Sequence, residues 1–144
     1  MKKILFLVPL AILFYACKKD GVGSKPVVSF ISYSTDSIGK NTDMLMITLN
    51  VKDGDGDIEN LVNLAPIRNS RQDTPYIKRK MPGIGANKGS NVNAEVRVLL
   101  QSNDFVVGTV TPPKDSLRFG IYIVDNAGNI SDTIYTPKIP FNRQ

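Results

Sequence analysis

Apolar residues recur at every second position over several segments of this chain. In residues 45–52, Leu45, Ile47, Leu49 and Val51 alternate with more polar neighbours, and residues 92–100 and 117–123 repeat the pattern. A period of two is typical of β-strands with one buried face. Further β-rich runs predict strands at residues 27–33, 76–81, 105–110 and 130–136.

One segment has helical spacing instead. Ile58, Leu61, Val62 and Ala65 would share a helix face, and Asp57 could cap it, so a single helical turn is expected there. The remaining chain consists of alternating strands separated by turn residues. We therefore predict an all-β fold, an immunoglobulin-like antiparallel β-sandwich of about seven strands.

The first residues predict an export signal. Lys2 and Lys3 precede twelve apolar or aromatic residues at 4–15, and Ala16 stands directly before Cys17, the only cysteine. This run is shorter than the roughly 20 residues of a transmembrane helix and has the features of a secretory signal. The cysteine at the cleavage point favours a bacterial lipoprotein signal helix over residues 1–16, with Cys17 as the lipidated residue. A plain signal peptide with an accidental cysteine is the alternative.

The expected organisation is a signal peptide (1–16), a lipid-anchored tether (17–26) and one β-sandwich domain (27–144). The tether segment KKDGVGSKP is polar and rich in Gly, Ser and Lys, as flexible linkers are. Loss of Lys2 and Lys3 from the 18 basic residues leaves 16 against 13 acidic ones, or about +3. This charge is too small to indicate nucleic acid as a partner, and membrane contact is expected through the N-terminal lipid.

Several catalytic chemistries lack their residues in this chain. There is no histidine, which excludes Ser-His-Asp and Cys-His sites and imidazole ligands for zinc. There is no Trp for stacking on sugar rings, and lipidation of Cys17 would leave no thiol for redox chemistry.

Residues 66–90 form a basic region that Pro and Gly residues interrupt. Its basic residues are Arg68, Arg71, Lys78, Arg79, Lys80 and Lys88, against one acid, Asp73. Such a region could contact phosphate or acidic sugar at a membrane surface, or could simply be a solvated loop.

The segment VKDGDGDI places Asp53, Asp55 and Asp57 at alternate positions with glycines between them. Three adjacent carboxylates repel one another, and a bound cation removes that cost. Calcium binds 6 to 8 oxygen ligands in flexible geometry, so it suits this loop. The segment is not an EF-hand, because Ile58 and Leu64 stand where that motif has Gly and Glu. The alternative is that the Asp-Gly pairs only form a turn.

A second segment repeats this loop. LNVKDGDGDI (49–58) aligns without a gap with IYIVDNAGNI (121–130), so that Asp53 matches Asp125 and Asp57 faces Asn129. In an immunoglobulin-like sandwich the second and sixth strands finish at the same end of the sandwich, which would bring the loops that follow them together. We therefore predict a metal site, with calcium as the cofactor, formed by Asp53, Asp55, Asp57, Asp125 and Asn129. Coincidence between two turns is the alternative.

The lipobox cysteine, DGDGDI after a strand, and DNAGNISDTI with TPKIPF near the end resemble small lipoproteins of Bacteroidota. The resemblance implies an immunoglobulin- or cadherin-like sandwich, although Glu59 replaces the glycine that usually follows DGDI in that family. Lys18, Lys19 and Asp20 partly match the signal that directs such lipoproteins to the cell surface, so display at the surface or in the periplasm stays open.

Together these features predict a non-enzymatic, lipid-anchored outer-membrane lipoprotein. Its expected role is that of a structural or binding module stiffened by calcium. One rival is a glycan- or peptide-binding accessory subunit of a surface uptake complex, with a surface protein or glycan as partner. The other is a hydrolase that uses the clustered aspartates around a metal.

Overall fold

The computed structural model describes residues 23–69, 74–83, 89–106 and 114–142. The predicted signal peptide, Cys17 and the first six residues of the expected tether therefore lie outside the described residues. Within these four ranges, no helix has the length and apolar character needed to cross a membrane.

Strands make up most of the described chain, as the sequence pattern predicts. The described elements are β1 (Val27–Tyr33), β2 (Ile38–Gly39), β3 (Met44–Asp53), β4 (Leu61–Arg68), β5 (Ile77–Lys80), β6 (Val92–Gln101), the short helix α2 (Ser102–Phe105), β7 (Lys114–Val124), β8 (Ile134–Tyr135) and β9 (Ile139–Asn142).

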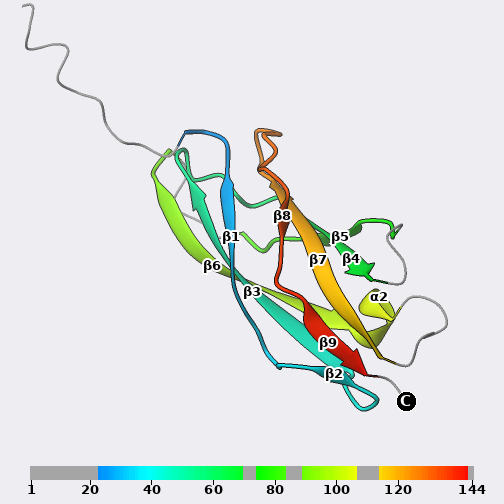
Figure 1. Cartoon of the computed structure of the whole chain (residues 1–144). Helices are drawn as coiled ribbons and strands as arrows, with labels where there is room; N and C mark the ends of the chain where they lie inside the picture. Colours follow the sequence, from blue (N-terminus) through cyan, green and yellow to red (C-terminus); the bar gives the residue numbers. More distant parts are fainter. Residues whose placement is uncertain (1–22, 70–73, 84–88, 107–113, 143–144) are drawn as a thin grey trace, which may run out of the picture.

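Two sheets pack against each other (Figure 1). The first has the strand order β1-β3-β6, and the second has the order β2-β9-β7-β4-β5, with β8 paired to β7. All described strand pairs are antiparallel except β2 with β9. The predicted all-β sandwich is confirmed.

The alternating apolar residues of β3 and β7 meet in one core between the sheets. The fully buried members from these two strands are Leu45, Ile47, Leu49, Val51, Leu117, Phe119, Ile121 and Ile123. A buried side chain of this size contributes roughly 1.5–3 kcal/mol to folding, so this core holds the two strands in fixed positions. The ends of β3 and β7 are therefore well defined.

The predicted helical turn near Ile58–Ala65 is wrong, because Leu61 to Arg68 form strand β4. β4 lies between β7 and β5, and most of its residues are buried, so its apolar positions do not alternate. Pro66 is tolerated because, among the described residues, β5 pairs with Leu61 to Leu64 and no strand pairs with β4 beyond that point on the side away from β7.

Of the three remaining strand predictions, one is confirmed and two need adjustment. The run at 76–81 is confirmed as β5, but Phe105 ends helix α2, and residues 107–110 lie outside the described part. Of the run at 130–136, only Ile134–Tyr135 form a strand, with an isolated bridge between Val124 and Ile130. Strands β2 and β9 were not predicted.

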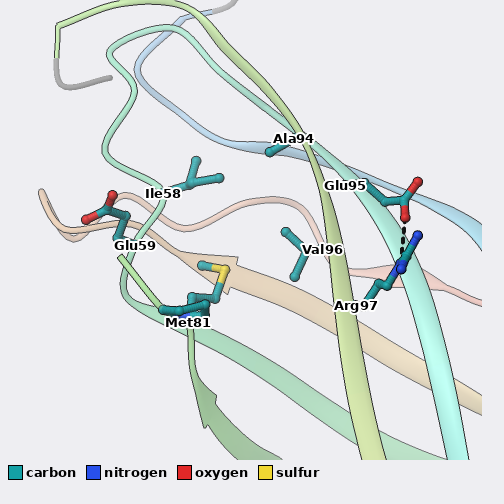
Figure 2. A pocket seen from close by; sticks show the side chains of 8 residues that line it. Ile58, Glu59, Met81, Ala94, Glu95, Val96 and Arg97 are labelled. Atoms are coloured by element: carbon teal, nitrogen blue, oxygen red, sulfur yellow. Dashed lines mark hydrogen bonds and ion pairs between the residues drawn. The ribbon is translucent and has the colours of Figure 1, made fainter. Parts of the chain in front are cut away.

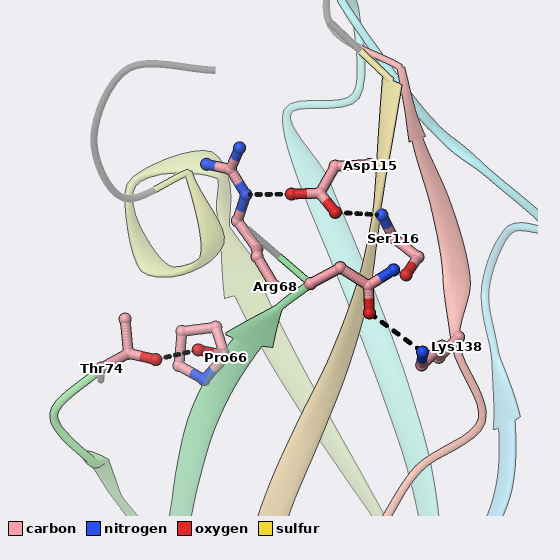
Figure 3. A network of polar contacts seen from close by, with 7 residues as sticks. Pro66, Arg68, Thr74, Asp115, Ser116 and Lys138 are labelled. Atoms are coloured by element: carbon pink, nitrogen blue, oxygen red, sulfur yellow. Dashed lines mark hydrogen bonds and ion pairs between the residues drawn. The ribbon is translucent and has the colours of Figure 1, made fainter. Parts of the chain in front are cut away.

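Arg68 is not part of an exposed basic surface (Figure 3). It is 5% exposed, and its Nε donates to Asp115 Oδ2 at 3.2 Å, while its guanidinium lies 5.0 Å from the ring centre of Phe141. The other Asp115 oxygen accepts the Ser116 backbone N–H at 2.7 Å. The prediction that Arg68 belongs to a surface-contact region is therefore wrong. The residue joins the C-terminal end of β4 to the N-terminal end of β7 instead.

Candidate metal centre

The two strands with matching sequence end side by side. Asp53 is the last residue of β3 and Asp125 follows the last residue of β7, and neither has any solvent exposure. Since these strands belong to different sheets, the loops that follow them meet across the sandwich. The backbone N–H of Asn126 donates to the carbonyl of Asp57 at 2.9 Å, and Asn60 Nδ2 donates to the carbonyl of Asp125 at 2.8 Å. The predicted meeting of the loops is confirmed.

The sequence match between the loops is also a match in backbone geometry. The N–H of Asp57 donates to Asp53 Oδ2 at 3.0 Å, and the N–H of Asn129 donates to Asp125 Oδ1 at 2.7 Å. Gly56 and Gly128 occupy the same place in each loop and have φ angles of 71° and 88°. Only glycine adopts this left-handed conformation at little cost, which explains why both loops carry it there.

Four carboxylates converge at this junction, and we call them the acidic cluster: Asp53, Asp55, Asp57 and Asp125. Each offers one oxygen, and these oxygens all lie within 4.8 Å of one another. The side chains are buried or half-buried, with Asp57 at 9% exposure. Among the described residues, this is a group that can hold a metal ion.

Unsatisfied oxygen atoms make this junction suitable for a cation. Oδ1 of Asp53, of Asp55 and of Asp57 are buried and have no hydrogen-bond partner in the part of the chain that the structure describes. Leaving a buried charged oxygen unpartnered costs at least 1–3 kcal/mol, so proteins rarely accumulate three in one place. A cation between the loops would satisfy all three oxygens at once.

The same burial opposes ionisation. Burial raises the pKa of Asp53 above its usual value, and the charges of Asp55 and Asp57 add to the increase. Burial also raises the pKa of Asp57, and repulsion from the charges of Asp125 and Asp55 raises it further. A cation bound beside these carboxylates would replace the lost solvation and stabilise their charged form.

Asn129 contacts the cluster through Asp125. Its Nδ2 donates to Asp125 Oδ2 at 2.9 Å, and its backbone N–H holds Oδ1 of the same carboxylate. Asn129 thus orients Asp125, while its own ligation of a metal stays a prediction. The sequence predicts Asn129 in the site, but its spacing gives no sign of this orienting contact.

Residues 23 and 24 of the expected tether also contact the two loops. Gly54 donates its backbone N–H to the carbonyl of Gly23 at 3.1 Å, and Asn129 Nδ2 donates to the carbonyl of Ser24 at 3.1 Å. No sequence motif marks these contacts.

Comparison of the chain with family models, curated proteins and solved structures finds no match.

Proposed function

We propose that this protein is a non-enzymatic, lipid-anchored outer-membrane module whose β-sandwich is stiffened by one calcium ion between the β3–β4 and β7–β8 loops. The observation that carries the proposal is the set of three buried, unpartnered oxygens on Asp53, Asp55 and Asp57, joined by Asp125 from the other sheet. The order β1-β3-β6 opposite β9-β7-β4-β5 supports an immunoglobulin-like arrangement of the strands.

The donor set favours calcium over other common metals. All four acidic ligands offer oxygen, whereas zinc sites usually contain nitrogen or sulfur. Two oxygens at 2.3–2.6 Å from one calcium can lie at most about 5 Å apart. The spacing of up to 4.8 Å fits that limit, while magnesium with its bonds of about 2.1 Å would need the cluster to contract.

Calorimetric titration of the chelator-treated protein with calcium, and separately with magnesium, tests this proposal. We expect one calcium site per chain that Asp57→Asn weakens strongly. Asp36→Asn is the control, since it removes the same charge from an exposed position outside the cluster. Absence of calcium binding, or equal effects of the two substitutions, would contradict the proposal.

A small pocket favours the accessory-subunit alternative (Figure 2). It has a volume of about 130 Å³ and is lined by apolar Ile58, Met81, Ala94 and Val96, with the Glu95–Arg97 ion pair at its rim. Ligand sites for small molecules usually measure 300–1,000 Å³, so this pocket suits one apolar side chain of a peptide better than a sugar chain.

Titration with extended peptides, each presenting one apolar side chain between charged ones, would test the alternative. Specific NMR shifts at Ala94 and Val96 would support it. Unchanged spectra at millimolar peptide would remove it.

A further inference from the structure

Resting on the calcium site proposed above, we infer that the same ion fixes the membrane-proximal segment of the chain, residues 23–26, on the end of the domain. Calcium would then set how the domain stands relative to its lipid anchor. The inference comes from the contacts between this segment and the two loops that carry the acidic cluster.

Two consecutive carbonyl groups are held by different loops. The Gly23 carbonyl accepts from the N–H of Gly54, which lies between the cluster members Asp53 and Asp55. The Ser24 carbonyl accepts from Nδ2 of Asn129, whose same nitrogen donates to Asp125 Oδ2. An amide NH₂ has two donor hydrogens, so Asn129 can serve the cluster and the segment together.

The geometry makes both contacts depend on the distance between the loops. Gly54 follows β3 in the first sheet, and Asn129 follows β7 in the second. Neighbouring carbonyls of one chain can separate only by a short distance, so they meet both donors only while the loops stay close. Repulsion among four carboxylates separates the loops when no cation is bound, and a cation draws them together.

The segment has further contacts that limit its movement. Pro26 is buried, and Lys25 Nζ lies 2.7 Å from Oδ1 of Asp132, farther along the β7–β8 loop. This ion pair is exposed, with side-chain exposures of 54% and 91%, and exposed ion pairs contribute little to stability. The two carbonyl contacts, and not the ion pair, therefore link the segment to the cluster.

The short chain before Gly23 gives this link a consequence for orientation. Only six residue steps separate Cys17 from Gly23. Even fully extended, they span about 20 Å, so a lipidated Cys17 keeps the acidic cluster near the membrane. Docking of residues 23–26 would restrict the domain to few orientations, and their release would let it swing on a longer tether.

Two measurements on the full mature chain, with and without calcium, test the inference. A fluorophore on Ser24→Cys reports local motion; if Cys17 is lipidated, it is the only other cysteine and is blocked. NMR hydrogen exchange at the Gly54 amide reports its contact with Gly23. We expect calcium to raise the anisotropy of the label and to slow exchange at Gly54 at least about fivefold, the lower range of typical coupling between sites.

Variants separate this inference from the calcium site itself. Asp55→Asn should abolish both responses, and Lys25→Ala, which removes only the exposed ion pair, should leave both unchanged. A label on Asp36→Cys, beyond the far end of β1, should not respond. If calcium binds but neither the label nor Gly54 responds, the inference is wrong and the calcium site stands. If calorimetry detects no calcium binding, both are wrong.

Discussion

Neutralising one carboxylate of the acidic cluster should have opposite effects with and without calcium. Asp55→Asn is the best substitution, because Asp55 Oδ1 is buried without a partner, whereas Asp53 and Asp125 accept backbone N–H groups. In chelator, the substitution removes repulsion and should stabilise the fold. In calcium, it removes a ligand and should destabilise the fold relative to the wild type.

The structure gives the size of the effect. Two charges 4.8 Å apart repel by about 1 kcal/mol in a water-like dielectric and about 3.5 kcal/mol at an effective dielectric of 20. We therefore expect a gain of about 1–3 kcal/mol in chelator, or roughly 4–12 °C in melting temperature for a domain of this size.

Thermal unfolding followed by circular dichroism, at pH 7 in chelator and in excess calcium, measures both effects. Asp36→Asn is the matched control for net charge and should shift neither melting temperature by more than about 2 °C, as most surface substitutions do. If Asp55→Asn lowers the melting temperature equally in chelator and in calcium, the carboxylate has a structural role and the reasoning from repulsion is refuted.

Three further predictions concern other parts of the chain. Asp115→Ala should cost about 3–5 kcal/mol, because it removes the carboxylate that pairs with the buried Arg68 guanidinium. Denaturant unfolding should detect that loss. Lys25→Ala, which removes an exposed ion pair, is the control and should cost less than about 1 kcal/mol. An equally small cost for Asp115→Ala would contradict the prediction. Burial raises the pKa of Tyr33 to about 12, although its hydrogen bond to Thr136 lowers it. The tyrosine therefore ionises at lower pH in the unfolded chain than in the folded one, and the free energy of unfolding should fall between pH 10 and 12. Tyr33→Phe should flatten that decline in alkaline melting curves, and an unchanged decline would assign it to other groups. Mass spectrometry of membrane-extracted protein should find a diacylglyceryl group on Cys17, and an unmodified cysteine or cleavage elsewhere would exclude the lipid anchor.

The sequence predicts strands well where one face is buried and the other is wet, as in β3, β6 and β7. It fails at β4, because burial on nearly all of its residues removes the alternation and leaves Ile58, Leu61, Val62 and Ala65 at helical spacing. Two-residue strands such as β2 carry too few residues for any pattern, and their pairing depends on the rest of the sheet.

The acidic cluster could be predicted because the loop motif occurs twice, after strands that finish at the same end of the sandwich. The match of Asp53 to Asp125 is enough to predict that the second loop belongs to the site. The contacts of Gly23 and Ser24 could not be predicted in this way. Their backbone carbonyls bind the loops, and a carbonyl contact leaves no mark on residue type.

The most direct test of the proposed calcium site is the calcium-dependent shift in melting temperature of the wild type and of Asp125→Ala. At a hundredfold excess over Kd, calcium should add about 2.7 kcal/mol to the stability of the wild type, which corresponds to roughly 10 °C. Asp125→Ala should lose a clear part of that shift, because Asp125 brings the second sheet to the ion. A wild-type melting temperature that is equal in calcium and in chelator would contradict the central claim, and a shift unaffected by Asp125→Ala would confine the ion to one loop.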